Sequence, residues 1–427
     1  MSPLKKSPLV LCKPTDFTLS SGLRVVHLPS QSPVVYCGIA INAGTRQEAP
    51  GEEGLAHLCE HTTFKGTKRR TALQILNCLE SVGGDLNAFT NKEDTVFYAA
   101  VQREHFTRAV DLLTDIVFNS QYPSQEVAHE IAVVCDEIES YNDTPAELIY
   151  DEFENLVFQG HPLGHNILGT RERVQSFTSS DTLRFTHCYY RPDNAVFFVY
   201  GDISFPRLVK SLEQRITANF NENQNESPNV QRSTFSDRAE CGVAITVHRS
   251  PFNVPHHQAH VMLGCRAYSY NDERRMALYL LNNLLGGPGM NARLNLSLRE
   301  RNALVYTIES TMASYSDTGC WSVYFGCDHH DVKRCLHLVR RELDKLMQHP
   351  LSERQLQAAK RQLKGQLAIA CDNREQYALD FARHYLHDGK VRDITDILSR
   401  IDALTAPQLQ DVAQHLFAPD RLQQLMV

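Results

Sequence analysis

Apolar segments recur in the same order in the two halves of the chain. Each half opens with a strand pattern, over 34–43 in the first half and 258–265 in the second. A helical pattern follows over 53–64 and 272–285, and glycine ends each of these helices. This shared order of elements predicts an internal repeat.

The remaining elements of each half continue the repeat. Two neighbouring strands are expected in each half, at 85–90 and 95–101, and at 305–310 and 321–326. Two helices then close each half, at 104–118, 125–141, 331–347 and 353–370. Because strands precede helices and neighbouring strands pair, the pattern predicts an α+β fold of two homologous α/β halves. Each half is expected to hold an antiparallel-rich sheet covered by helices.

A polar, asparagine-rich stretch at 219–233 separates the two halves and has no apolar periodicity. With 427 residues, the chain is also longer than one hydrophobic core usually organises. We therefore expect an N-terminal half over 1–218, a linker over 219–233 and a C-terminal half over 234–427.

Composition narrows the class of protein and of partner. The chain is 42% hydrophobic and 22% charged, as globular proteins are, and its net charge of -7 provides no basic surface for nucleic acid or an anionic membrane. Its apolar runs are strand-sized and shorter than the ~20 residues of a membrane helix. No secretion signal is visible, and 12 cysteines without a CxxC pair are typical of reduced thiols. A cytoplasmic protein without disulfides, nucleic acid or membrane contact is expected.

The strongest chemical signal is the H-x-x-E-H pattern of His57, Glu60 and His61. Residues four apart on a helix share one face, so both imidazoles can reach one metal ion. Neutral imidazoles are good ligands for zinc. Glu60 lies beside the second histidine, where its carboxylate can accept a proton from an attacking water as general base.

Other interpretations of this segment stay open at this point. Five residues of this kind can also form by chance on a helix with surface histidines. A closed structural zinc site is a further alternative, but such sites are usually rich in cysteine. Cys59 points away from the histidine face of the helix, so we interpret it as a packed thiol.

A catalytic zinc needs a third protein ligand, and a carboxylate on the helix at 125–141 is the natural candidate. Asp136, Glu137 and Glu139 are all available there, and spacing alone does not choose between them. Glu130 lies two helical turns before Glu137 and therefore on the same face. One of these two glutamates can bind the metal while the other orients the site.

The motif and its surroundings resemble the pitrilysin/insulinase superfamily of inverted zinc metallopeptidases, the inverzincins, most closely its mitochondrial-processing-peptidase-like subfamily. In that family the third ligand is a glutamate on a later helix, with a second glutamate two turns before it. The resemblance therefore implies Glu137 as the ligand and Glu130 as its supporting carboxylate. The matching helix of the second half lacks the motif, so one zinc ion per chain is implied.

The resemblance also implies where a substrate binds. Residues 84–90 resemble the family's substrate-binding edge strand, whose contact positions here are Asn87, Ala88, Phe89 and Thr90. In the second half, Arg299 and Tyr306 match a pair that in active relatives reaches across a clam-like cleft to the substrate. A guanidinium and a phenol can donate hydrogen bonds where oxyanion charge develops.

The function implied is that of a zinc-dependent endopeptidase. Peptides or unfolded polypeptides would bind in extended form, and Glu60 would activate a zinc-bound water. The resemblance also implies a homodimer. The alternative is a catalytically inactive scaffold, or a processing-complex subunit, of the same fold. The intact motif argues against that alternative.

Overall fold

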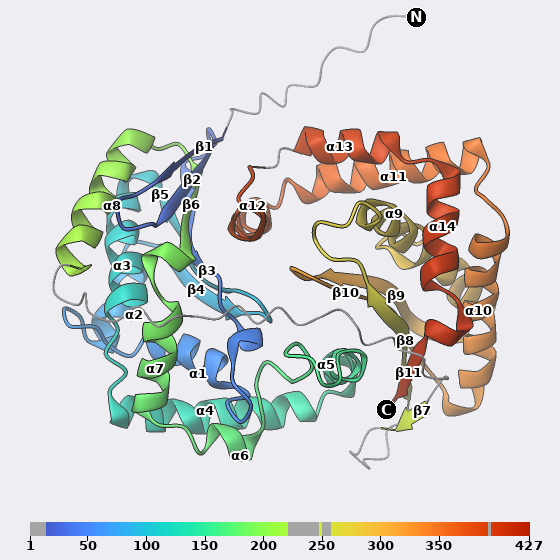
Figure 1. Cartoon of the computed structure of the whole chain (residues 1–427), viewed down its shortest axis with the longest axis horizontal. Coiled ribbons are helices and arrows are strands. Elements are labelled where there is room, and N and C mark those ends of the chain that lie inside the picture. The colour runs from blue at the N-terminus through green and yellow to red at the C-terminus, as the bar shows by residue number, and fades with distance from the viewer. Residues whose placement is uncertain (1–13, 221–246, 250–257, 392–393) are drawn as a thin grey trace, which may run out of the picture. The chain divides into compact units, whose positions relative to one another are not determined.

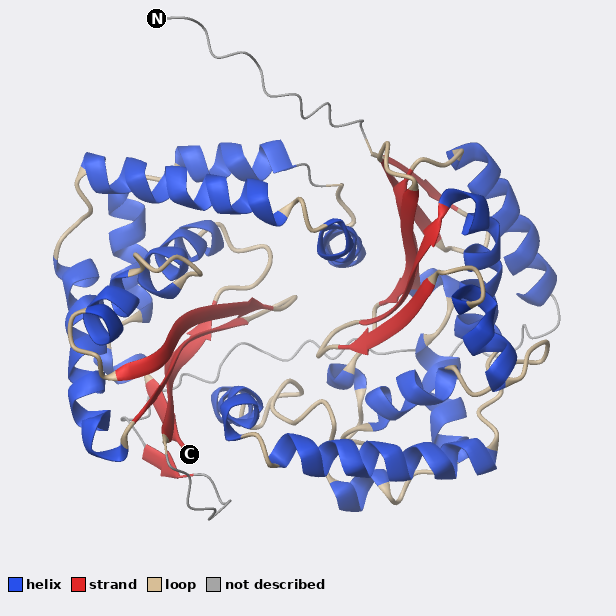
Figure 2. Cartoon of the chain, turned by 180° about the vertical axis from the view of Figure 1, so that it is seen from behind, coloured by secondary structure: helices blue, strands red, loops and turns tan. Residues whose placement is uncertain are grey.

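The computed structural model describes residues 14–220, 247–249, 258–391 and 394–427. They form two compact units, each built on one sheet with helices packed over it (Figure 1, Figure 2). Within the described residues, the first unit holds 14–134, 171–220 and 373–391, and the second holds 135–170, 247–249, 258–372 and 394–427.

The first unit has a six-stranded sheet in the order β1-β2-β6-β3-β5-β4. Its neighbours are antiparallel except for β2 and β6, which are parallel. The strands are β1 (Thr15–Thr18), β2 (Arg24–Pro29), β3 (Val34–Ile41), β4 (Asp85–Thr90), β5 (Thr95–Gln102) and β6 (Ala195–Gly201). The helices are α1 (Leu55–Thr63), α2 (Ala72–Glu80), α3 (Phe106–Asn119), α4 (Ser124–Asn142, of which the part up to Val134 belongs here), α6 (Arg171–Val174), α7 (Ser179–Tyr189), α8 (Phe205–Phe220) and α12 (Arg374–Asp388).

The second unit has a five-stranded sheet in the order β7-β11-β8-β10-β9, again antiparallel except for one pair, β7 and β11. The strands are β7 (Val247–Arg249), β8 (Ala259–Ala267), β9 (Val305–Ser314), β10 (Gly319–Cys327) and β11 (Gln423–Met426). The helices are α5 (Pro145–Val157), α9 (Arg275–Gly286), α10 (Val332–Gln348), α11 (Glu353–Ala370), α13 (Ile394–Ala403) and α14 (Ala406–Leu416).

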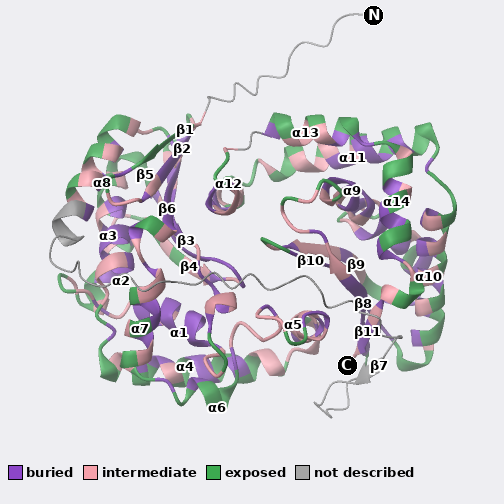
Figure 3. Cartoon of the chain, viewed as in Figure 1, coloured by how far each residue is buried: buried purple, intermediate pink, exposed green. Residues whose placement is uncertain are grey.

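Both sheets are covered on two faces. Successive side chains of a strand point to opposite sides, so each central strand packs against both covers. In the second sheet, Met262 and Tyr324 pack against Phe153 of α5. Their neighbours Leu263 and Val323 point the other way, into the larger core beneath α9, α10 and α14. Figure 3 shows the central strands of each sheet as buried. Double coverage explains why a strand such as β6 is an unbroken apolar run.

In the first sheet, α12 provides the second cover. Its Ala378, Ala382 and Tyr385 pack on a sheet face that includes Ala40 and Phe198 (Figure 1). α12 belongs to the C-terminal part of the chain, yet it completes the first unit, while α5 from the N-terminal part completes the second. The compact units therefore differ from the expected halves, 1–218 and 234–427, in these exchanged segments. Most of the predicted linker at 219–233 lies outside the described residues.

The α+β class with two antiparallel-rich sheets is confirmed. The repeated elements also match their predicted places, and 85–90 and 353–370 have the predicted bounds. The pattern missed α2 and the exchanged helices α5 and α12. It also gave no prediction for α6, α7, α8, α13 and α14, or for the strands β1, β2, β7 and β11. An apolar helix face shows that a helix is buried, but not which sheet it covers. Among the described residues, no helix is both long and apolar enough to cross a lipid bilayer.

Candidate zinc and catalytic site

All three residues of the H-x-x-E-H motif lie on α1. The side chain of Glu48, a few residues before this helix, caps its first turn. Gly54 precedes α1 in the left-handed conformation, with a φ of 97° that favours glycine. It has no side chain with which to cap the helix. The buried carboxylate of Glu48 instead accepts the N–H groups of Gly54 at 3.2 Å and Ala56 at 2.7 Å. A negative group at this end also complements the helix dipole, so Glu48 stabilises the helix that carries the motif.

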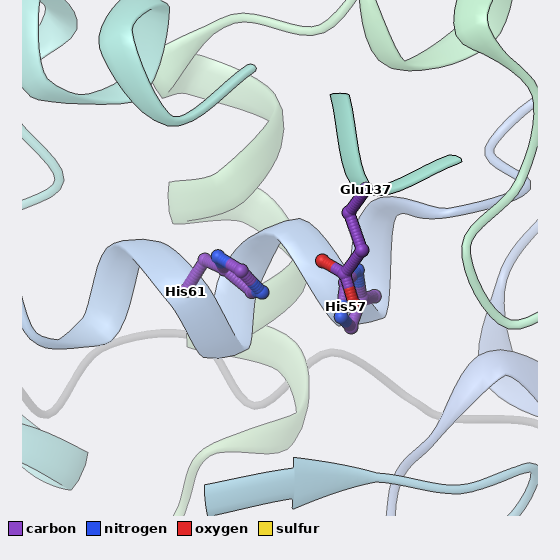
Figure 4. Close-up of side chains that lie close together, drawn as sticks. All are labelled: His57, His61 and Glu137. Atoms are coloured by element: carbon purple, nitrogen blue, oxygen red, sulfur yellow. The ribbon is translucent and has the colours of Figure 1, made fainter. Parts of the chain in front are cut away.

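His57 and His61 lie one turn apart on α1, with ring centroids separated by 4.6 Å. Glu137 on α4 reaches the same place, and one possible ligand atom from each of the three residues lies within 4.8 Å of the others. Figure 4 shows Glu137 extending toward His57, with the imidazole of His61 turned toward both. Of the three carboxylates that spacing left open, Asp136 and Glu139 are not in this cluster. Sequence spacing alone did not make that distinction.

The protonation of His57 is set mainly by its burial. Burial, and to a lesser extent the charge of His61, lower the pKa of His57 to about 3. The imidazole is therefore neutral near pH 7. Neutral imidazole is the form that binds a metal ion.

Glu130 supports the second histidine. Its carboxylate is buried, with one oxygen 3.4 Å from Nδ1 of His61 and the other 2.7 Å from Nζ of Lys65. Because a carboxylate accepts hydrogen bonds, it favours the tautomer of His61 with the proton on Nδ1. That tautomer presents the lone pair of Nε2 to a metal.

Glu60 is buried on the same helix, with only 8% of the residue exposed. The Oγ1 hydroxyl of Thr90, at the end of β4, donates a hydrogen bond to Oε2 of Glu60 at 2.6 Å. The sequence resemblance placed Thr90 among substrate contacts, whereas its side chain is buried against Glu60. The first unit thus joins its edge strand directly to the motif.

The turn that follows Thr90 is fixed by buried Asp94. The two carboxylate oxygens of Asp94 lie 2.7 Å from the Asn91 amide, 2.9 Å from Nε of Arg383 and 3.0 Å from Nε2 of His387. Burial alone would raise the pKa of Asp94. The hydrogen bond from His387 and the charge of Arg383 outweigh it and hold that pKa at about 2. The ionised carboxylate anchors the β4–β5 turn to α12.

The predicted substrate positions Asn87, Ala88 and Phe89 lie on β4, at the edge of the described sheet. β4 pairs with β5 only, so its outer backbone edge faces away from the sheet. Asn87 is exposed, and its amide donates to Asp85 at 2.9 Å. Phe89 packs edge-to-face on Tyr98, with 6.1 Å between ring centroids. An edge of this kind can accept an extended peptide as a further strand.

Arg299 and Tyr306 come together in the second unit. Arg299 lies in a π-helical turn, Asn295–Glu300, and Tyr306 lies near the start of the edge strand β9 with 80% of its surface exposed. Both residues line one cavity of about 650 Å³ beside β9. Glu309 is the other charged residue in its lining.

Comparison with known proteins identifies the family. Residues 24–171 match the family described as insulinase (peptidase family M16), and residues 176–363 match the peptidase M16 inactive domain. The "uncharacterized zinc protease YmxG" of Bacillus subtilis is 30% identical over 406 residues, which are 95% of this chain and 96% of that protein. The chain belongs to the M16 insulinase family. An uncharacterized zinc protease of Mycobacterium leprae is 32% identical over 93% of this chain and 88% of its own.

Two solved structures share the fold. A protease from Helicobacter pylori superposes with a TM-score of 0.88 at 22% identity, covering 97% of this chain and 99% of that one. A peptidase M16 inactive domain from Pseudomonas fluorescens gives 0.85 at 18% identity, with 97% of both chains covered. The resemblance to the pitrilysin/insulinase superfamily is thus confirmed, and the finer placement beside mitochondrial processing peptidases stays a prediction.

Sequence reasoning missed two acids that support the site of this M16 chain. Glu48 caps α1 from outside the usual capping positions, so no local capping rule signals it. Asp94 is a turn residue by pattern, and its partners Arg383 and His387 come from a helix nearly 300 positions later in the chain. Only the folded first unit brings these groups together.

Proposed function

We propose that this chain is a zinc-dependent endopeptidase that hydrolyses peptides bound in extended form. The observation that carries the proposal is the convergence of His57, His61 and Glu137 from two helices onto a point that one ion can occupy. Membership of the M16 family and the names of its relatives as zinc proteases agree with this function.

The donor set fits zinc in a catalytic site. Two imidazoles and one carboxylate make three protein ligands, which is the number that leaves a coordination position open. The neutral state of His57 and the tautomer of His61 favoured by Glu130 agree with metal binding. When bound, zinc would polarise the scissile carbonyl and lower the pKa of a water molecule.

In this proposal Glu60 is the general base. It takes a proton from the attacking water and later delivers it to the leaving amine. The burial of Glu60 restricts proton exchange with bulk solvent, and the hydrogen bond from Thr90 restricts the motion of its side chain. The outer edge of β4 binds the peptide backbone through main-chain hydrogen bonds, which tolerate many sequences.

We further propose that Arg299 and Tyr306 bind the peptide near the scissile bond, so that catalysis needs both halves of the chain. Tyr306→Phe removes one hydroxyl donor and should lower kcat by ~10²-fold, as loss of a single oxyanion donor typically does. Zinc content should stay unchanged, because Tyr306 is not in the metal cluster. Steady-state kinetics of the zinc-loaded full chain would check this, and an unchanged kcat would remove the assignment.

The function itself is tested with the purified full chain and a mixed peptide library read by mass spectrometry. We expect about one zinc ion per chain, internal cleavage of peptides, loss of cleavage with a zinc chelator and recovery when zinc is restored. A chain that holds zinc and leaves the whole library intact would instead support the alternative of an inactive scaffold or processing-complex subunit. Sedimentation of the same sample would test the homodimer that the resemblance implies.

A further inference from the structure

The geometry points to Thr90 as the residue that positions Glu60, by fixing the plane of the carboxylate so that one oxygen is bound to the strand and the other is turned away from it. This inference rests on the proposed function, in which Glu60 is the general base. It gives Thr90 a role that acts through the base and not through the substrate.

The count of protons in the cluster sets the direction of each hydrogen bond. Thr90 has one hydroxyl proton, and Oε2 of Glu60 lies 2.6 Å from its oxygen. The other neighbour of Thr90 is Oγ1 of Thr95 at 3.5 Å, and Thr95 donates its own proton to the carbonyl of Ala43 at 2.9 Å. The short bond to a carboxylate is the stronger of the two available to Thr90. Thr90 is therefore the donor and Glu60 the acceptor.

The hydrogen bond matters because a glutamate does not fix its own carboxylate plane. The last torsion of the side chain is broad, so the plane of the carboxylate can rotate over a wide range of angles. A donor at 2.6 Å in a buried setting removes that freedom. A base held in one orientation keeps the geometry that proton transfer requires, and misplacement by about 1 Å can cost ~10²-fold in rate.

Thr90 can hold Glu60 only if its own backbone is fixed, and the first unit provides this. Thr90 pairs with Thr95 across the β4–β5 hairpin, and the N–H of Asn91 donates to the carbonyl of Asp94 at 2.8 Å to close the turn. Asp94 is in turn anchored to α12 by Arg383. The hydroxyl therefore projects from a rigid corner toward α1.

The second unit shows the same link without the base. There Oγ of Ser310, on edge strand β9, donates to the amide oxygen of Asn282 on α9 at 2.6 Å. The indole of Trp321 donates to the same Ser310 hydroxyl at 3.0 Å. A strand-to-helix hydroxyl bond is thus a packing feature of both units, and in the first unit its acceptor is the proposed base. The experiment must therefore separate positioning from packing.

Three variants of the full chain make this separation. Thr90→Val keeps the volume and the branched shape but removes the hydroxyl, while Thr90→Ser keeps the hydroxyl. Thr95→Val is the matched control, because it removes a buried hydroxyl from the cross-strand partner, and that hydroxyl donates to Ala43 and not to Glu60. Zinc content, kcat and KM would be measured for each, together with crystal structures of the two Thr90 variants.

We expect Thr90→Val to lose roughly 10- to 100-fold in kcat, with little change in KM and full zinc content. Thr90→Ser and Thr95→Val should stay within about threefold of wild type in kcat, since both leave a donor facing Glu60. In the crystals, Glu60 should keep its orientation in Thr90→Ser and lose it in Thr90→Val.

Several results would overturn the inference. An unchanged kcat in Thr90→Val would do so, as would a rise in KM alone, which would return Thr90 to the substrate contacts. An equal loss of kcat in Thr95→Val would show that the effect comes from packing and not from the positioning of Glu60. The crystal structures test the positioning role of Thr90 independently of the proposed peptidase function. If the wild-type chain cleaves nothing, the proposed function fails, and the orientation of Glu60 in Thr90→Val still decides whether Thr90 positions it.

Discussion

Glu60→Gln should lower kcat for peptide cleavage by roughly 10²–10⁴ while the chain still holds one zinc ion. Glutamine keeps the volume of the side chain, and its amide oxygen can still accept the hydrogen bond from Thr90. What it loses is the ability to take a proton from water near pH 7. The substitution therefore removes the chemistry and leaves the packing in place.

The matched control for this prediction is Glu342→Gln, which makes the same change at another buried glutamate. Glu342 lies on α10 of the second unit and pairs with Lys345 at 2.7 Å. Its kcat should equal that of wild type. Zinc content by metal analysis and kcat by steady-state kinetics would be measured on all three proteins. If Glu60→Gln cleaves at the wild-type rate, Glu60 is not the base and the mechanism proposed here is wrong.

Much of the fold could be predicted because its elements are set by local patterns. The strand and helix periods of the repeated elements indicate where along the chain these elements lie, and α11 carries a full capping box at Ser352. The exchange of α5 and α12 between the units could not be predicted. It depends on which sheet offers a matching apolar face, such as Met262 and Tyr324 for Phe153, and no local pattern encodes that choice.

The candidate site divides in the same way. The spacing of His57, Glu60 and His61 is local to one helix, so the sequence alone placed them on one α-helix. The contact between Thr90 and Glu60 joins residues 30 positions apart and depends on the packing of β4 over α1. The family resemblance implied that Thr90 is a substrate contact, which stays a prediction. A strand pattern does not show that the Thr90 hydroxyl is turned toward Glu60.

Glu137→Gln should lose most of the zinc, whereas Asp136→Asn and Glu139→Gln should keep it. The three acids lie within one turn of α4, all are exposed, and each variant removes one negative charge. They therefore differ in one relevant respect, which is that only Glu137 belongs to the cluster with His57 and His61. Losing a partner that merely supports a ligand typically costs 10–100-fold in metal affinity, and losing a ligand itself should cost more. Zinc retained after dialysis against a weak chelator would be measured for each variant.

Exposure of Glu137 also predicts how the metal-free protein behaves. An exposed carboxylate makes a small contribution to folding, so without zinc Glu137→Gln should unfold at nearly the same temperature as the metal-free wild type. With zinc added, only proteins that bind the ion should gain thermal stability, since a ligand stabilises the state to which it binds. Added zinc should therefore raise the unfolding temperature of wild type, Asp136→Asn and Glu139→Gln by similar amounts, and that of Glu137→Gln by much less. If Glu137→Gln shifts as far as wild type, or if Asp136→Asn loses its zinc instead, the third ligand has been assigned to the wrong carboxylate.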